Sequence, residues 1–355
     1  ACRKSTGVPL GEPKGKAEEA ARRLLQAGVL TQARDTRDVG FIEYLNDFWR
    51  ADGEYCRQAV SVKGKALSTA YIRHNTGDIR LHIATYKPFA KMRLAAVTAG
   101  DVERWQLWAR EQHGITGNRV NHCLKLVKVA IGQAVRRNLI QYDPSKIITK
   151  ASEIKTEKGI LTQAEAAAVC AVPLDNPRRL LPVLLGLCCG MRKGEIRGLQ
   201  WGDIQGGIID IRHNWVDDDG LREPKCGSFR KVPYGAAVSA CLDAVRATAR
   251  HIGGADFVLE SLVIDGEPVS QNFNNISLAA VLAEIGISKG EQKQRNLSSH
   301  SLRHSFISLA RLAGVDPLIV QTLAGHTDIA MTDHYTHAAQ AMDYEAVRAK
   351  FRLIA

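Results

Sequence analysis

The sequence predicts an α+β protein, in which a helical domain is followed by a mainly α-helical domain with a small antiparallel β-sheet. Apolar residues recur at helical spacing over residues 39–152 and again after residue 161. Within the second part, residues 206–234 show the β-branched alternation and the turn residues of short antiparallel strands. A polar stretch poor in apolar residues separates the two parts, as in an interdomain linker. We therefore expect four segments: an N-terminal leader with a short helix (1–38), a helical domain (39–152), a linker (153–160) and the second domain (161–355).

The bulk composition favours a nucleic-acid partner. The 355 residues carry a formal net charge of +11, and a basic chain attracts polyanions through electrostatic steering and counterion release. The eight cysteines lack paired C-x-x-C spacing, which indicates small buried side chains in a reducing compartment. No apolar run approaches the ~18 residues of a membrane span, and no signal peptide is visible. We therefore expect a soluble cytoplasmic protein with no membrane partner.

The helical domain is expected to contain four amphipathic helices. They are indicated at Phe41–Trp49, Leu67–Tyr86, Thr98–Trp108 and Thr116–Asn138. One face of the last helix is polar and basic, and it carries Arg119, Asn121, His122, Lys125 and Lys128. Such a face is most often simply solvated, but a helix that follows DNA phosphates looks the same. Both interpretations stay open from the residues alone.

The second domain opens with clear helix signals. Thr162 and Glu165 form the T-x-x-E pattern of a capping box, and a buried helix then runs to a stop at Gly190. Arg192 follows in the first turn after that glycine, and Glu195 lies one turn further on. Arg192 therefore lies at the end of a helix, where its side chain can project into a cleft.

Strand signals come next. GGIIDIRHNWV (206–216) predicts one strand, DDDG (217–220) predicts a hairpin turn, and LREPKCGSFRKVPY (221–234) predicts one or two returning strands. Lys225 lies near the tight turn at Gly227. Two or three further helices are expected next, at 236–250 and 270–284.

Residues 298–337 concentrate groups that can bind or attack a phosphate. A helix after Ser301 places an apolar stripe at i, i+4, i+7 and i+11 in the core: Leu302, Phe306, Leu309 and Ala313. Asp316-Pro317 predicts the start of a short helix, and Gly325 predicts its end. His326 directly follows that end, and Tyr335 lies nine residues later.

Six side chains from distant segments lie at element ends, from which they can reach a common cleft. They are Arg192, Lys225, His300, Arg303, His326 and Tyr335. Guanidiniums can bind the oxygens of a phosphorane-like state, an ammonium can protonate a departing 5′-oxygen, and a phenol can form a covalent phosphotyrosine. This chemistry needs no cofactor and no metal, and the sequence has neither a Walker A stretch nor a GxGxxG.

Four boxes in this order resemble the tyrosine recombinases of the phage integrase family: CGMRKGEI, EPKCGSFRKVP, HSLRHSF and LAGHTDIAMTDHY. The resemblance covers roughly residues 160–340. It implies the following roles: phosphate binding for Arg192, Arg303, His300 and His326, general acid for Lys225, nucleophile for Tyr335, and a supporting acidic position for Glu195.

The resemblance extends to other parts of the chain and to its partners. Residues 41–150 resemble the family's helical core-binding domain, which is SAM-like, and CRKSTGVP resembles the last strand of its arm-type DNA-binding domain. The family implies double-stranded DNA attachment sites, a homotetramer on synapsed DNA, and a DNA-bending host factor or an excisionase as further partners. It also implies integration or excision of a phage or mobile element. Residues 336–355 carry an apolar stripe, which could dock on a neighbouring protomer or fold back on its own domain.

Three other interpretations fit parts of the sequence. His300 and His304 are four residues apart and could begin a zinc site with His326, His334 or His337, but Arg303 lies between them and no carboxylate or thiolate completes the shell. A type IB topoisomerase would use the same chemistry without joining two duplexes. A non-catalytic DNA-binding regulator would have no use for an accessible tyrosine beside two arginines.

Overall fold

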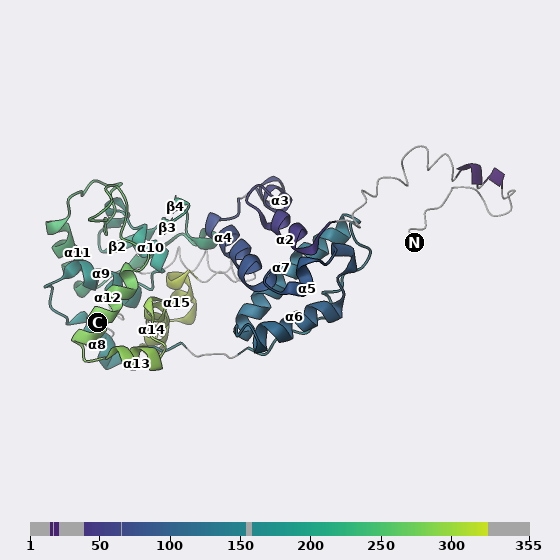
Figure 1. Ribbon diagram of the computed structural model, residues 1–355. Coiled ribbons are helices and arrows are strands. Elements are labelled where there is room, and N and C mark those ends of the chain that lie inside the picture. The colour runs from purple at the N-terminus through teal and green to yellow at the C-terminus, as the bar shows by residue number, and fades with distance from the viewer. Residues whose placement is uncertain (1–14, 17, 21–38, 65, 154–157, 326–355) are drawn as a thin grey trace. The chain divides into compact units, whose positions relative to one another are not determined.

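The computed structural model describes residues 15–16, 18–20, 39–64, 66–153 and 158–325 (Figure 1). The chain divides into two compact units between residues 155 and 156, and each unit has a hydrophobic core of its own. Within the described residues, no helix is both long and apolar enough to cross a membrane.

Unit 1 is built from helices. They are α2 (Phe41–Trp49), α3 (Glu54–Lys63), α4 (Thr69–Asp78), the π-helix η2 (Ile79–Ile83), α5 (Lys87–Ala90), the 3₁₀ turn η3 (Leu94–Ala96), α6 (Ala99–Glu111) and α7 (Gly117–Arg136). The longest, α7, packs against α2, where the Trp49 Nε1–H donates to the carbonyl oxygen of Leu126 at 3.4 Å. The Tyr44 hydroxyl donates to the carbonyl of Ala130 at 3.1 Å, and burial raises the pKa of Tyr44 to about 12.

Helix caps explain where the elements of unit 1 begin. Thr98 and Asp101 form a reciprocal capping box at α6, and the Thr116 side chain caps α7. The predicted helix Leu67–Tyr86 ends earlier, at Ile83, and Pro88 lies in the first turn of α5, where its missing N–H costs nothing. The sequence did not indicate α3, because only two of its side chains are buried and its apolar stripe is weak.

Unit 2 combines helices with two small sheets. Its elements are α8 (Gln163–Cys170), α9 (Pro177–Cys188), α10 (Lys193–Arg197), the 3₁₀ turn η4 (Trp201–Asp203), β1 (Ile204–Gln205), β2 (Ile208–Ile211), β3 (Asn214–Val216), β4 (Gly220–Arg222), the 3₁₀ turn η5 (Lys225–Gly227), β5 (Arg230–Pro233), α11 (Ala236–Thr248), α12 (Phe273–Glu284), α13 (Lys289–Gln294), α14 (Ser299–Leu312) and α15 (Pro317–Ala324). The observed α+β class is the predicted one.

Helix α9 forms the centre of unit 2. Every residue from Leu180 to Leu187 is buried, as the uninterrupted apolar run predicts, and α11, α12 and α14 pack around this helix (Figure 1). The predicted capping box at Thr162 and Glu165 begins α8. Because α9 is enclosed on all these sides, its end at Cys188 is a rigid point from which the next segment can be placed.

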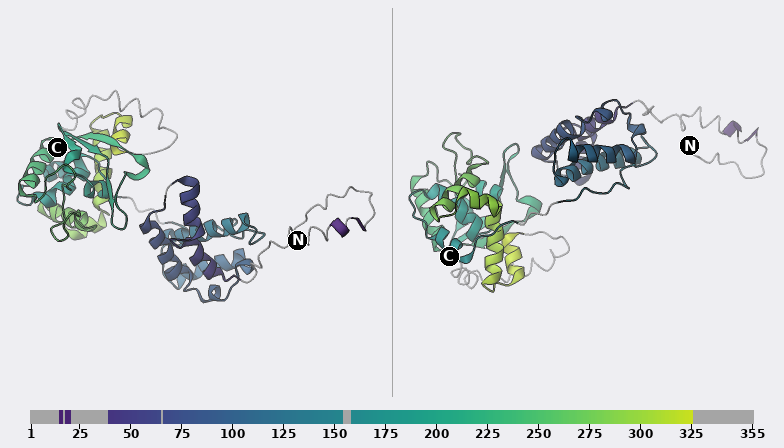
Figure 2. Two further views of the ribbon diagram at one scale, coloured as in Figure 1. Left: turned by 90° about the horizontal axis from the view of Figure 1, so that it is seen from above. Right: turned by 60° about the horizontal axis from the view of Figure 1, so that its bottom comes forward.

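The strands of unit 2 lie at the edge of its helical body (Figure 2). One antiparallel sheet has the order β1-β2-β5, with Ile209 opposite Val232, and β3 and β4 form a separate hairpin. The prediction of a single strand over 206–216 was wrong. β2 ends at Ile211 and β3 begins at Asn214, and the intervening Arg212 and His213 bind the buried carboxylate of Asp203 at 2.7 and 3.0 Å.

Candidate active site

A left-handed glycine follows the central helix and orients the first group of the site. Gly190 has φ +61°, and a Cβ on it would lie 2.5 Å from a ring carbon of Phe306, so only glycine fits. Its carbonyl oxygen accepts a hydrogen bond from Arg303 Nη1 at 2.6 Å. The turn therefore links the end of α9 directly to α14.

The Arg303 side chain is buried, yet only part of its guanidinium is hydrogen-bonded. Its exposed fraction is 2 %, and among the described residues its Nη2 has no hydrogen-bond partner. Burial lowers the pKa of Arg303 to about 9, and the charges of Arg192 and Arg230 add to this effect, while Glu195 opposes it. An unsatisfied buried donor costs about 1–3 kcal/mol, and more when it is charged. An anion bound at Nη2 would remove that cost.

Arg192 stands at the entrance to α10 and is held by a capping box. Its backbone N–H donates to Glu195 Oε2 at 2.9 Å, and its Nη1 donates to Glu195 Oε1 at 2.6 Å and to the Ser228 hydroxyl at 3.1 Å. Its Nη2 donates to the carbonyl of Gly325. The side chain is 23 % exposed, so it can still meet a ligand.

Glu195 is the buried anion of the cluster. Its side chain is fully covered, and burial alone would raise its pKa. Hydrogen bonds and charges from Arg230 and Arg192 outweigh burial and hold the pKa below its ordinary value. Two arginines therefore bind one carboxylate, and the charge of Arg303 acts on the same group, which leaves an excess of positive charge for a ligand to neutralise.

Arg230 was missed by the sequence reasoning. It lies in β5 opposite Ile211, and its guanidinium binds both carboxylate oxygens of Glu195, at 3.0 and 2.6 Å. An arginine in a short strand usually faces water, so its residue type alone does not indicate burial. The alternation of β5 was the available signal: Arg230 and Val232 share the buried face, and Lys231 faces outward.

Two further predicted groups lie on η5 and on α14. Lys225 is exposed on the 3₁₀ turn η5, in the connection that carries the chain from β4 to β5. His300 lies in the first turn of α14, and its ring meets His304 edge to face at 4.8 Å. Burial lowers the pKa of His300, and His304, Arg303 and Arg192 lower it further, so the ring is neutral at pH 7.

His326 and Tyr335 lie outside the described residues. Gly325 is the last residue described, and it ends α15 in the left-handed conformation, as predicted. The zinc interpretation needs His326, His334 or His337 as a third ligand, and these also lie outside the described part. The structure thus brings Arg192, Glu195 and Arg303 together and leaves the nucleophile's position as a prediction.

The polar face of α7 is largely occupied by contacts within unit 1. Arg119 binds both oxygens of Asp78 at 3.0 Å, and His122 lies 3.3 Å from the same carboxylate. Asn121 binds the backbone of Ala151 and the carboxylate of Glu153, and Lys128 donates to the carbonyl of Ile148. Lys125 is exposed. DNA contact by these residues stays a prediction.

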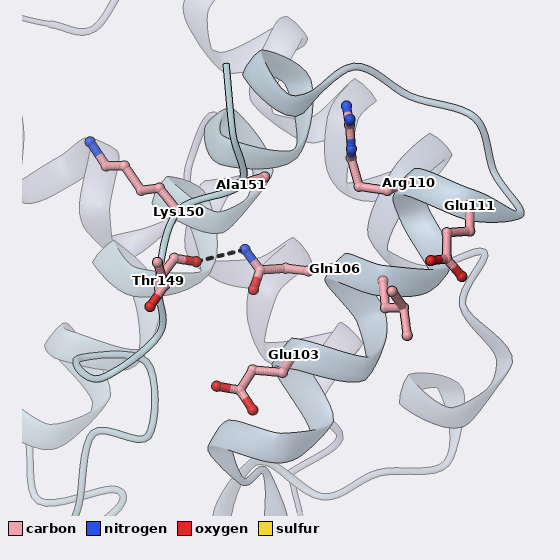
Figure 3. A pocket seen from close by; sticks show the side chains of 8 residues that line it. Glu103, Gln106, Arg110, Glu111, Thr149, Lys150 and Ala151 are labelled. Carbon is pink, nitrogen blue, oxygen red and sulfur yellow. Dashed lines mark hydrogen bonds between the residues drawn. The ribbon is translucent and has the colours of Figure 1, made fainter. Parts of the chain in front are cut away.

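Unit 1 also contains an open hollow of about 530 Å³ between α6 and residues 149–151 (Figure 3). Gln106 closes one side through a 3.2 Å hydrogen bond to the carbonyl of Thr149. The charged groups around it do not converge, since Arg110 and Glu111 point in different directions (Figure 3). Polar groups therefore converge less in this hollow than in the arginine cluster of unit 2, which consists of Arg192, Arg230 and Arg303 with Glu195.

Comparisons with known proteins identify the class. Over 253 residues, the chain is 26 % identical to tyrosine recombinase XerC of Xylella fastidiosa, covering 68 % of this chain and 78 % of the relative. It is 31 % identical over 219 residues to tyrosine recombinase XerD of Pseudomonas aeruginosa, covering 58 % and 66 %. The protein is a tyrosine-type site-specific recombinase. Residues 160–342 match the phage integrase family, and the chain belongs to it.

Solved structures share the fold. The Tn1549 transposon integrase in complex with a circular intermediate DNA superposes with a TM-score of 0.64 at 20 % identity, over 84 % of this chain and 98 % of that chain. A lambda integrase tetramer bound to a Holliday junction gives a TM-score of 0.59 at 16 % identity, over 92 % and 88 %. Both confirm the α+β class predicted from the sequence.

Proposed function

We propose that the protein cuts and rejoins double-stranded DNA at attachment sites through a covalent 3′-phosphotyrosine, and thereby integrates or excises a phage or mobile element. One observation carries the proposal: the buried Arg303 keeps Nη2 without a partner among the described residues, beside the partly exposed Arg192. This is the arrangement that a DNA phosphodiester would complete, and it could also stabilise the second negative charge of the phosphorane-like transition state. The integrases of Tn1549 and lambda, whose structures contain DNA, support a DNA substrate.

The proposed reaction is an in-line transfer at phosphorus. The Tyr335 oxygen forms a bond to phosphorus as the bond to the 5′-oxygen breaks, the phenolic proton leaves to solvent, and Lys225 gives a proton to the departing 5′-oxygen. Rejoining runs the same steps backwards, since the phosphotyrosine conserves the bond. No external energy source is needed.

The arginine cluster would stabilise the transition state. Arg192 and Arg303 can each bind non-bridging oxygens through paired N–H donors, and the neutral ring of His300 can donate one N–H, with His326 proposed as a further donor. Removing one such donor from an enzyme typically costs about 10²–10³-fold in rate. Glu195 supports the cluster by fixing Arg192 rather than by touching the phosphate.

We propose that unit 1 acts as the core-binding domain and unit 2 as the catalytic domain. The net charge of +11 and the exposed Lys125 support a DNA contact through phosphates, with affinity that falls as salt rises. The lambda integrase tetramer on a Holliday junction supports a homotetramer that joins two duplexes. A DNA-bending host factor or an excisionase, and arm-type DNA binding by residues 1–38, are parts of the same proposal.

The test maps the covalent junction. The full chain is incubated with a duplex library that has a randomised core and a nick beside each candidate scissile position, so that cleavage traps the intermediate. Protein-linked strands are then isolated under denaturing conditions, and both the DNA and the modified peptide are sequenced. We expect the 3′-phosphate on Tyr335, and we expect Tyr335→Phe to bind DNA but form no adduct.

Two other tyrosines provide matched controls. Tyr344→Phe and Tyr142→Phe should form the adduct at the wild-type rate, since neither is the proposed nucleophile. An adduct on another residue, or none in the wild type, would contradict the assignment. Transfer of a strand between two labelled duplexes then separates a recombinase from a topoisomerase, which reseals only its own duplex.

A further inference from the structure

We propose that Arg230 is a positioning residue for DNA cleavage. It fixes the direction of Arg192 and the point at which the chain leaves α15 toward His326. The proposal rests on the function proposed above. The Arg230 side chain is only 3 % exposed, so it acts through its neighbours and not by binding DNA itself.

The guanidinium of Arg230 is almost fully engaged. Its Nε–H donates to the carbonyl of Leu323 at 2.7 Å, and Nη1 donates to the Ser228 carbonyl at 3.2 Å and to Glu195 Oε1 at 3.0 Å. Nη2 donates to Glu195 Oε2 at 2.6 Å. Four hydrogen bonds thus use four of the five N–H groups that an arginine has.

Arg230 and Arg303 differ in how completely their N–H groups are hydrogen-bonded. Both guanidiniums are buried in the same cluster, but Arg303 Nη2 has no partner among the described residues, and Arg230 has no nitrogen of that kind. Arg303 is therefore arranged to receive a ligand, whereas Arg230 is arranged to hold protein groups. A paired guanidinium in a dry site forms a fixed reference for the groups around it.

The first group that Arg230 holds is the Glu195 carboxylate. Both oxygens accept from Arg230, and Arg192 Nη1 shares Oε1 at 2.6 Å. Because Arg230 fixes the plane of the carboxylate, it also fixes the direction from which Arg192 approaches. Without it, the buried Glu195 would retain one cationic partner and would neutralise Arg192 more completely, leaving less charge for a phosphate.

The second group is the end of α15. Arg230 binds the Leu323 carbonyl and Arg192 binds the Gly325 carbonyl, so two cations meet the negative end of the helix dipole. Gly325 has φ +63°, and a Cβ on it would lie 3.0 Å from Arg230 Nη1. The left-handed turn favours glycine, and a Cβ would crowd the Arg230 guanidinium. These contacts therefore fix the last described residue, which precedes His326 in the sequence.

The test uses the nicked duplex that is identified by mapping the covalent junction. Its cleavage rate is measured under single-turnover conditions, with the full-length protein in excess over the DNA. We expect Arg230→Ala to lower the cleavage rate about 100-fold, as a displacement of about 1 Å in a catalytic group does, with unchanged DNA affinity. Free guanidinium chloride at low millimolar concentration should raise that rate, because it can refill the site. Arg230→Lys keeps the positive charge but loses the paired N–H donors of the guanidinium. Its cleavage rate should lie between those of Arg230→Ala and the wild type.

Arg197→Ala is the matched control. Arg197 is equally buried in unit 2, donates its Nε–H to the Val269 carbonyl at 2.7 Å and pairs with Asp217. Within the described part of the chain, its side chain makes no hydrogen bond to Arg192, Glu195 or Arg303. The Arg197→Ala variant should lose thermal stability as Arg230→Ala does. At a temperature where both variants are folded, Arg197→Ala should cleave at the wild-type rate, and added guanidinium should not change that rate.

The outcomes are distinguishable. Wild-type cleavage by Arg230→Ala, or an equal loss of rate in Arg197→Ala with no guanidinium response in either, overturns the positioning role alone. Absence of a tyrosine adduct in the wild type overturns the proposed function and this inference with it. If Arg230→Ala does not fold, Arg230→Lys decides: a wild-type rate refutes the proposal, and a slower rate at unchanged DNA affinity and melting temperature supports it.

Discussion

Arg303 Nη1 donates to the carbonyl oxygen of Gly190 at 2.6 Å, although the two residues are 113 positions apart in the chain. The bond fixes the catalytic arginine proposed for α14 to the end of the central helix α9. It also turns the other half of the guanidinium, Nη2, away from protein partners among the described residues. The direction of the free N–H groups is thus decided by one glycine carbonyl.

Gly190→Ala should therefore damage both stability and cleavage. The left-handed backbone costs alanine about 1–2 kcal/mol, and the contact of 2.5 Å with Phe306 adds about 1–3 kcal/mol of overpacking. Urea unfolding measures the loss of stability, and the rate of adduct formation measures the loss of cleavage. Gly314→Ala is the control, because Gly314 has φ +74° with open space around it, so it should lose only the backbone cost and cleave normally. Equal effects of the two changes would contradict the role of Gly190.

Glu165→Gln should change how stability depends on pH. The hydrogen bonds from Arg295, at 2.7 and 2.8 Å, are the largest cause that holds the pKa of Glu165 down to about 2 from an ordinary 4.5. Because the folded pKa is lower than the unfolded one, the carboxylate contributes stability above pH 4.5 that is lost as pH falls toward 2.

The contribution should be about 2 kcal/mol after allowance for its partial exposure. Urea unfolding at neutral pH should show that deficit in Glu165→Gln, and the two curves should converge in acid. Glu291→Gln, which removes a more exposed partner of the same Arg295, should cost about 0–1 kcal/mol. A constant difference across the whole pH range would contradict the linkage.

Cleavage and rejoining should not need a divalent metal, since the proposed site stabilises the phosphate with guanidinium groups. The measurement is adduct formation and strand transfer in excess EDTA, compared with added Mg²⁺ or Zn²⁺. We expect equal rates in chelator and in Mg²⁺ at matched ionic strength, since salt alone weakens DNA binding. Activity that is lost in EDTA and restored by Zn²⁺ would revive the interpretation based on His300 and His304.

Removal of residues 338–355 should weaken assembly more than binding. The sequence places Met342, Val347, Phe351 and Ile354 on or near one helical stripe, and a neighbouring protomer offers one surface that could bury it. A heterologous contact of this kind closes a ring of protomers and links each nucleophile to the next subunit. These residues lie outside the described part of the chain, so the docking remains a prediction.

Native gels with one and with two attachment sites provide the measurement. The shortened chain should bind a single site normally and pair two sites poorly. A full-length Phe351→Ser variant is the control for loss of the stripe without loss of length, and it should show the same defect. Unchanged pairing in both proteins would mean that the segment packs on its own domain.

The sequence by itself determined most of the local structure around the site. The capping box of Thr162 and Glu165, the start of α15 at Asp316 and its end at Gly325 all follow from neighbours within a few positions. The order of the four boxes likewise indicated the family to which the chain belongs. Such signals survive in sequence because each depends on a hydrogen bond or a backbone angle that adjacent residues control.

The tertiary structure decided which charged groups are buried and what they bind. Arg230 meets Glu195 across 35 positions and Leu323 across 93, and no local pattern encodes those partners. In the same way, Arg119 on the predicted DNA face is bound to Asp78, 41 positions away. Burying a guanidinium is unfavourable unless its hydrogen bonds are satisfied, and only the folded chain supplies the acceptors at the required distances.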